Sequence, residues 1–163
     1  MIPTASAMTS PFSLLWPTFA LVALIFTVWA ALFVQRAAHM RRNPAGPDDL
    51  ASGDGAKRYF APVEMPANNL ANLFETPVLY FALVPLLLMF RQVSTAQLVL
   101  AWAFVTLRAA HSVIHIARGP VPIRFLVYAA STAALVAMWI GFFVDALYAS
   151  RLWEIHAGLL AQL

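Results

Sequence analysis

Four apolar runs, each long enough to cross a lipid bilayer, constrain this sequence more than any other feature. They cover about residues 11–34, 72–90, 95–116 and 122–144, and a helix needs about 20 apolar residues to span the hydrocarbon core. Across the chain 62% of residues are hydrophobic and 10% are charged, whereas soluble domains average about 45–50% and 25%. The pattern predicts an all-α integral membrane protein, a single domain whose four transmembrane helices form an antiparallel bundle.

The cysteine and charge content excludes several classes of function. The chain has no cysteine, so it can form no disulfide framework, thiolate zinc site or cysteine nucleophile. Its net charge of +3 comes from ten basic residues spread thinly over an apolar chain, which does not make a nucleic-acid-binding patch. The first apolar run follows no basic residue and exceeds the length of a signal-peptide core, so we expect a retained helix.

Basic residues are divided unevenly between the two sides of the predicted bundle. One side carries seven of them: Arg36, Arg41, Arg42, Lys57, Arg58, Arg118 and Arg124. The other side carries Arg91 and Arg151. Because short cytoplasmic loops collect Lys and Arg, we expect the first and third connections to be cytoplasmic and both termini to lie outside.

The connections and the C-terminal end carry their own signals. Residues 35–71 form the one long connection, and their Pro, Gly and Asp content predicts a partly ordered cytoplasmic loop, with the second helix extending back to about Pro66. Ser94 and Gln97 have capping-box spacing before the third span, and Pro122 suits the first turn of the fourth. Arg118-Gly119-Pro120 predicts a stop and restart between antiparallel neighbours. Residues 148–163, which mix apolar side chains with charges, predict a short interfacial helix.

Polar side chains within the spans predict a binding site. They share one face of each of three predicted helices: Asn68, Asn72 and Glu75 on the second, Arg108, His111, Ser112 and His115 on the third, and Arg124, Tyr128 and Ser131 on the fourth. Ionisable groups within a membrane are costly and usually functional. All three sets lie at the cytoplasmic ends, as do Arg36 and His39, so we expect an anion-binding pocket one or two turns deep that faces the cytoplasm.

Structural explanations of the same residues stay open. Glu75 could pair with Arg108 or Arg124 simply to hold helices together. His111 and His115 have no evident third donor, so the sequence predicts no metal site.

Three segments resemble the MAPEG family, the membrane-associated proteins in eicosanoid and glutathione metabolism. Residues 72–80 are similar to its Asn-x-x-Glu signature followed by proline, residues 108–115 to its Arg-x-x-His-Ser/Thr pattern, and residues 122–128 to the start of its fourth helix. The Phe-Glu-Thr-Pro sequence at 74–77 is closer to the bacterial-type branch. The resemblance covers about residues 11–145.

The resemblance implies a homotrimer in a bacterial inner membrane, with glutathione bound between protomers near the cytoplasmic face. It further implies a transferase or peroxidase that acts on lipophilic small molecules. The implied site residues are Arg124, which would hold the thiolate and be catalytic, Asn72, Glu75, Tyr128, Arg36 and His115, which would bind glutathione, and Arg108, His111 and Ser112, which would be structural.

Relatives that use glutathione usually carry an arginine in the turn before the Asn-x-x-Glu motif, where this sequence has Ala-Asn-Asn-Leu-Ala at 67–71. This departure favours the alternative, a non-catalytic membrane scaffold of the same family. A small transporter would need polar residues across the whole membrane, whereas these gather at one side.

Overall fold

The computed structural model describes residues 10–160. A short 3-10 helix, Pro11–Leu14, leads into α1 (Leu15–Arg42), which is followed by α2 (Gly53–Phe60), a second 3-10 turn (Ala61–Val63), α3 (Met65–Leu73), α4 (Thr76–Met89), α5 (Thr95–Ile116) and α6 (Val121–Leu160). The described residues contain no strand. The prediction of an all-helical fold is therefore confirmed.

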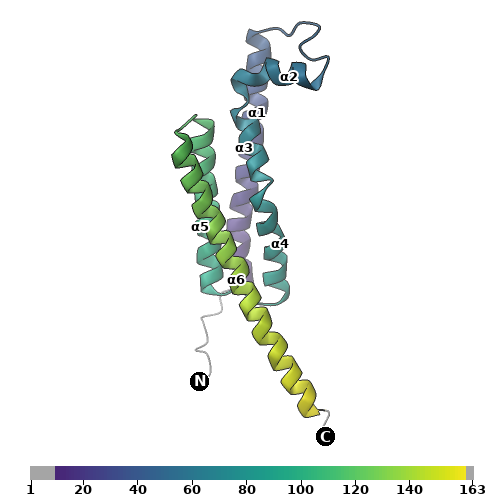
Figure 1. The fold of residues 1–163 in the computed structure, drawn as a ribbon, viewed down its shortest axis with the longest axis vertical. Coiled ribbons are helices and arrows are strands. Elements are labelled where there is room, and N and C mark those ends of the chain that lie inside the picture. Colours follow the sequence, from purple (N-terminus) through teal and green to yellow (C-terminus); the bar gives the residue numbers. More distant parts are fainter. Residues whose placement is uncertain (1–9, 161–163) are drawn as a thin grey trace.

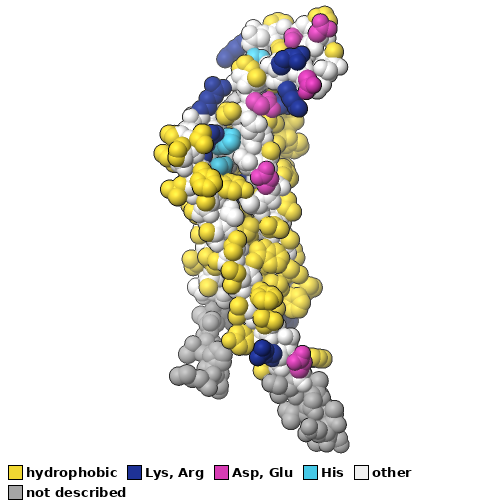
Figure 2. Space-filling model, viewed as in Figure 1, with side chains coloured by type: hydrophobic (Ala, Val, Ile, Leu, Met, Phe, Trp, Pro, Cys, Tyr) yellow, Lys and Arg dark blue, Asp and Glu magenta, His cyan; other side chains and the backbone are white. Residues whose placement is uncertain are grey.

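Among the described residues, four helical segments are long and apolar enough to cross a membrane: Phe12–Arg42, Met65–Met89, Thr95–Ile116 and Val121–Glu154. The second consists of α3 and α4, which follow one another along the same direction (Figure 1). α5 and α6 lie side by side, as the stop and restart near Gly119 predicted. Figure 2 shows Lys and Arg gathered towards the end that carries α2, with an apolar surface over the middle of the molecule.

The core joins α1, α4, α5 and α6 in the apolar half of the molecule. Tyr80 of α4 stacks on Phe104 of α5, with ring centroids 5.2 Å apart, and both are fully buried. The Tyr80 hydroxyl meets the Thr18 hydroxyl of α1 at 3.1 Å, because a buried phenol needs a hydrogen-bond partner. Leu21, Leu87 and Met138 close the same cluster.

The predicted cap of α5 is present. Ser94 accepts a hydrogen bond from the Gln97 backbone N–H at 3.2 Å, but the Gln97 side chain does not complete the reciprocal box. Its Nε2 instead donates to the Met138 carbonyl of α6 at 3.0 Å. A Cβ on Gly141 would lie 3.0 Å from Gln97 Nε2, so a larger residue there requires the Gln97 side chain to shift by a few tenths of an ångström.

The turn between α5 and α6 lies at the predicted stop and restart, between Ile116 and Val121. Arg118, rather than Gly119, adopts the left-handed conformation, with φ of 59°. The Gly119 N–H donates to the Ile114 carbonyl at 2.8 Å, and a Cβ on Gly119 would lie 2.6 Å from Ile114 Cγ2. Glycine is therefore needed for close approach rather than for a positive φ.

The connection after the first span is folded to a greater extent than expected. α1 continues to Arg42, and α2 packs its last turn on α1: the rings of His39 and Tyr59 are 4.9 Å apart, and the Tyr59 hydroxyl donates to the Asn43 carbonyl. α3 begins at Met65, close to the predicted start at Pro66.

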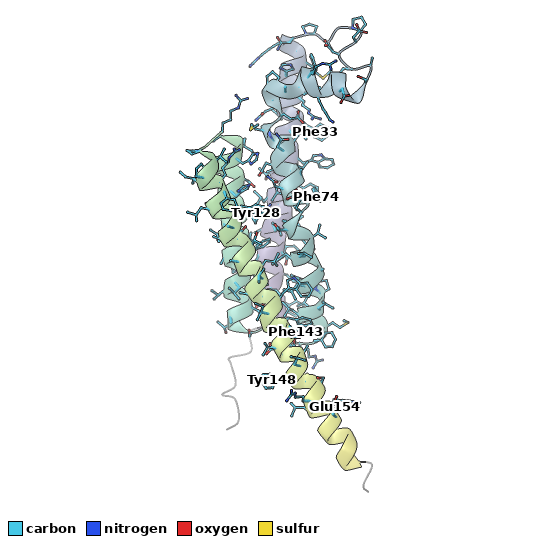
Figure 3. The ribbon with its side chains drawn as sticks, in the orientation of Figure 1. Phe33, Phe74, Tyr128, Phe143, Tyr148 and Glu154 are labelled. Carbon is cyan, nitrogen blue, oxygen red and sulfur yellow. The ribbon has the colours of Figure 1, made fainter. Side chains whose placement is uncertain are left out.

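The fourth helix does not end near Val144. It continues as one helix to Leu160, so the predicted short interfacial helix is the described end of α6 rather than a separate element. Figure 3 shows Phe143, Tyr148 and Glu154 successively further along this projecting end. Residues 161–163 lie outside the described part.

Candidate functional site

The helix of the second membrane crossing is interrupted beside the polar site. α3 ends at Leu73 and α4 begins at Thr76, because Pro77 has no N–H to donate and its ring clashes with the carbonyl four residues earlier. The Phe74 N–H donates to the carbonyl of Ala71, three residues earlier, at 2.9 Å. Arg108 of α5 donates from an Nη to the Asn72 carbonyl, which lies in this last turn of α3.

Arg108 is the buried centre of the cluster. Its side chain has no solvent-exposed surface, and its guanidinium lies over the Tyr128 ring of α6, with Cζ 5.1 Å from the ring centroid. Such a contact stabilises a desolvated cation. Arg108 is also within electrostatic range of Glu75. One arginine thus links three of the four crossings.

His111 joins α5 to the start of α6. Its Nδ1 donates to the Arg124 carbonyl at 3.0 Å, which fixes the proton on that nitrogen. Its ring centroid lies 5.5 Å from that of His115 and 5.6 Å from that of Tyr128. The predicted convergence of the polar faces of the third and fourth helices is observed.

Several donors in this cluster have no partner among the described residues. The Arg124 guanidinium is half-buried and makes no hydrogen bond or ion pair there. Buried donors without a hydrogen-bond partner include Nε and one Nη of Arg108 and the Ser112 hydroxyl. Nε2 of His111 also lacks a partner, but with the proton on Nδ1 it is an acceptor. Buried polar groups are normally satisfied, so this arrangement is suited to an anionic ligand.

The second-crossing residues are placed less uniformly than the sequence pattern suggested. Asn72 is half-buried, whereas Asn68 and Glu75 are exposed. Glu75 occupies the break, with ψ of −89°, so a count of 100° per residue does not carry across from α3. Among the side chains that the structure describes, the ion pairs are Arg36–Glu64 and Lys57–Asp54, and the considered pairing of Glu75 with Arg108 or Arg124 is not one of them.

A comparison with protein-family models matches residues 14–144 to the MAPEG family. The chain belongs to the MAPEG family. Searches of curated protein sequences and of solved structures gave no significant match. Family membership therefore rests on a match across nearly the whole membrane region of the chain.

In this MAPEG protein, Arg36 lies at the same end of the molecule but already has partners. It pairs with Glu64 at 3.1 Å, and its guanidinium lies 4.7 Å from the centroid of the Phe60 ring. Its proposed role as a ligand arginine remains a prediction.

Two polar residues near the site were missed by the sequence reasoning. Glu64 shares the helical face of Asn68 and Asn72 at spacings of four and eight, and extending that face by one turn would have identified it. Asn69 is fully buried, with both amide atoms unpaired among the described residues. The buried Pro66 and Leu73, three before and four after it, mark the inward face of α3.

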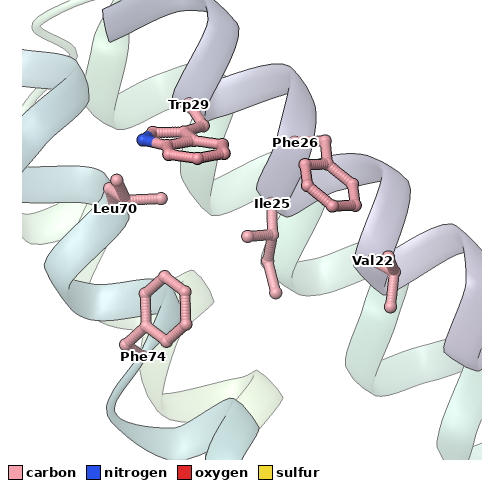
Figure 4. Close-up of a pocket in the computed structure, with 6 residues that line it drawn as sticks. All are labelled: Val22, Ile25, Phe26, Trp29, Leu70 and Phe74. Atoms are coloured by element: carbon pink, nitrogen blue, oxygen red, sulfur yellow. The ribbon is translucent and has the colours of Figure 1, made fainter.

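An apolar groove lies between α1 and α3. It has a volume of about 380 Å³ and is lined by Val22, Ile25, Phe26, Trp29, Leu70 and Phe74. Figure 4 shows the side chains of α1 facing Leu70 and Phe74 across it. The groove reaches the residue immediately before Glu75, next to the break in the second crossing.

Proposed function

We propose that this MAPEG protein is a membrane-embedded, glutathione-dependent transferase or peroxidase acting on lipophilic electrophiles. The observation that carries the proposal is the half-buried Arg124, whose guanidinium has no partner among the described residues. Its charge lies within electrostatic range of His111 and His115, and its backbone carbonyl accepts the hydrogen bond from His111. A nearby guanidinium lowers the pKa of a bound thiol, and the thiolate is the nucleophile.

We assign the remaining polar residues either to ligand binding or to holding the helices together. Asn72, Glu75, Tyr128, Arg36 and His115 would bind the peptide part of glutathione, while Arg108, His111 and Ser112 hold the helices that present them. Their amide, carboxylate and cationic groups match the ammonium and carboxylates of a zwitterionic peptide.

The chemistry starts from glutathione thiolate beside Arg124, with the thiol proton released to solvent. In a transfer reaction the sulfur forms a bond to an electrophilic carbon, and the leaving group departs with the electrons of the broken bond. In a peroxidase reaction the thiolate sulfur bonds to the terminal oxygen of a hydroperoxide while the O–O bond breaks, and the alkoxide leaves and takes a proton from solvent to become the alcohol. The thiol of a second glutathione then attacks the sulfur of the resulting sulfenic acid, which gives the disulfide and releases the sulfenic oxygen as water. The apolar groove that ends at Phe74 supports a lipophilic substrate that arrives through the bilayer.

We place this function in a homotrimer of the bacterial-type branch, in an inner membrane, with both termini outside and the site facing the cytoplasm. The excess of basic residues on the side of the site supports this orientation.

Glutathione binding to the detergent-purified protein tests the proposal. We expect millimolar glutathione to raise the melting temperature, and Arg124→Ala to reduce conjugation of 1-chloro-2,4-dinitrobenzene on the order of 10²-fold, as for loss of one electrostatic donor. The matched control is Arg58→Ala, which removes an exposed arginine of α2 and leaves the rate unchanged. Absence of binding, or an equal loss in the control, would overturn the proposal.

The alternative is a non-catalytic scaffold, and one contact favours it. One Nη of the buried Arg108 guanidinium donates to the Asn72 backbone carbonyl, a contact that joins two helices as a purely structural residue does. This alternative predicts that Glu75→Gln and Arg124→Ala disrupt assembly, measured by gel filtration with light scattering. Variants that stay assembled but lose conjugation would exclude the scaffold.

A further inference from the structure

The end of α1 carries two adjoining hollows that the proposed glutathione site does not use. One is lined by Val34, Ala37, Ala38, Arg41 and Arg42 and has a volume of about 380 Å³. The other, of about 250 Å³, shares Ala38 and Arg42 and is otherwise lined by three polar residues, Gln35, His39 and Asn43, and by the apolar Val63.

The first hollow combines an apolar floor with a cationic rim. Val34 and Ala37 are exposed on the outer face of α1, and the two alanines lower the surface where larger side chains would fill it. Arg41 and Arg42 stand one turn further on, are exposed, and form no ion pair within the described residues. Apolar surface beside unpaired guanidinium groups is complementary to an acyl chain attached to a phosphate.

The depth of the hollows fits the same ligand. α1 has 28 residues, which gives it a length of about 42 Å, comparable with the roughly 40–45 Å of a bilayer that includes its headgroups. Arg41 and Arg42 at its end therefore reach the headgroup region, while Val34 lies close to the acyl chains. The second hollow offers Gln35 and the Asn43 amide to the polar part of a headgroup.

We propose that this end of α1 is a binding site for an anionic phospholipid. The phosphate lies between Arg41 and Arg42, one acyl chain lies over Val34 and Ala37, and the headgroup reaches the hollow that contains Gln35. The site is separate from the polar cluster around Arg108 and does not depend on glutathione chemistry.

Native mass spectrometry of the full-length protein in neutral detergent tests the proposal, with dioctanoyl-phosphatidylglycerol as the probe. We expect the double variant Arg41→Gln/Arg42→Gln to bind it at least tenfold more weakly than the unaltered protein. The matched control is Lys57→Gln/Arg58→Gln, which removes the same charge from exposed positions of α2 outside both hollows and should bind as the unaltered protein does.

A second variant keeps Arg41 and Arg42 and fills the apolar floor of the first hollow. Ala37→Phe replaces an exposed residue, so the core is untouched, and we expect it to weaken phosphatidylglycerol binding at least tenfold with both arginines present. Circular dichroism and gel filtration establish that each variant is folded.

Three comparisons would overturn the proposal. Equal loss in the α2 control pair would mean unspecific charge attraction, and unchanged binding by Ala37→Phe would mean that no chain occupies the hollow. Equal affinity for inorganic phosphate or glycerol 3-phosphate would mean a site for free phosphate, and equal affinity for dioctanoyl-phosphatidylcholine would mean that the negative headgroup is not recognised.

Discussion

At the scale of single residues, arginines end α4 and α5 in a backbone conformation that usually belongs to glycine. Arg91 has φ of 55° and Arg118 has φ of 59°. At the end of α4, the Gln92 N–H donates to the Leu87 carbonyl at 2.9 Å, the pattern of a Schellman cap. The hydrogen bonds of the cap hold these residues in a conformation that an L side chain disfavours by roughly 1–2 kcal/mol.

We predict that Arg91→Gly stabilises the protein by about 0.5–1 kcal/mol, because relief of the left-handed conformation exceeds the extra entropy that glycine gives the unfolded chain. The measurement is the free energy of unfolding by SDS titration in mixed micelles. Arg91→Ala is the control, since it removes the same side chain but keeps the disfavoured φ. Equal stability of the Gly and Ala variants would contradict the explanation.

At the scale of elements, the break between α3 and α4 connects backbone geometry with the polar site. In a continuous helix the Asn72 carbonyl would accept from the N–H of Thr76, four residues on. The break at Glu75 and Pro77 leaves that carbonyl to Arg108. A proline in an apolar helix thus creates the acceptor that a buried guanidinium requires.

A double-mutant cycle tests this link. We predict that Arg108→Met lowers the free energy of unfolding in both backgrounds, but by about 1.5–3 kcal/mol less in the Pro77→Ala background than in the unaltered protein. That difference is the contribution of a hydrogen bond to a charged group. Pro85→Ala provides the control, because Pro85 is exposed within α4 and contributes no acceptor to Arg108. An identical effect of Arg108→Met in all three backgrounds would refute the link.

At the scale of the whole molecule, the first connection is fastened to the bundle at the end that carries the site. Arg36 of α1 pairs with Glu64, and Arg118 beyond α5 donates to the Pro62 carbonyl at 2.6 Å. These contacts hold the segment containing α2 against the first and third crossings.

We predict that Glu64→Gln accelerates amide hydrogen exchange in residues 53–63 about two- to fivefold, since a half-exposed ion pair contributes about 0.5–1 kcal/mol. The difference should shrink in 0.5 M salt because of screening. Asp48→Asn, the same charge change at an exposed position of the connection, should leave the exchange rates unaltered. Faster exchange in both variants would show that charge alone is responsible.

The sequence by itself determined the four crossings and the convergence of polar faces on α5 and α6. Hydropathy is a local property, because every backbone group in lipid must be satisfied within its own helix, and a regular helix carries the face of His111 through to His115. Only the tertiary structure decided which polar residues face inwards on the second crossing. Pro77 interrupts the helical phase at Glu75, which is exposed, and the packing of α3 on the other helices turns Asn69 inwards instead of Asn68. The pairing of Arg36 with Glu64 likewise depends on how the connection folds back, and no local pattern encodes that contact.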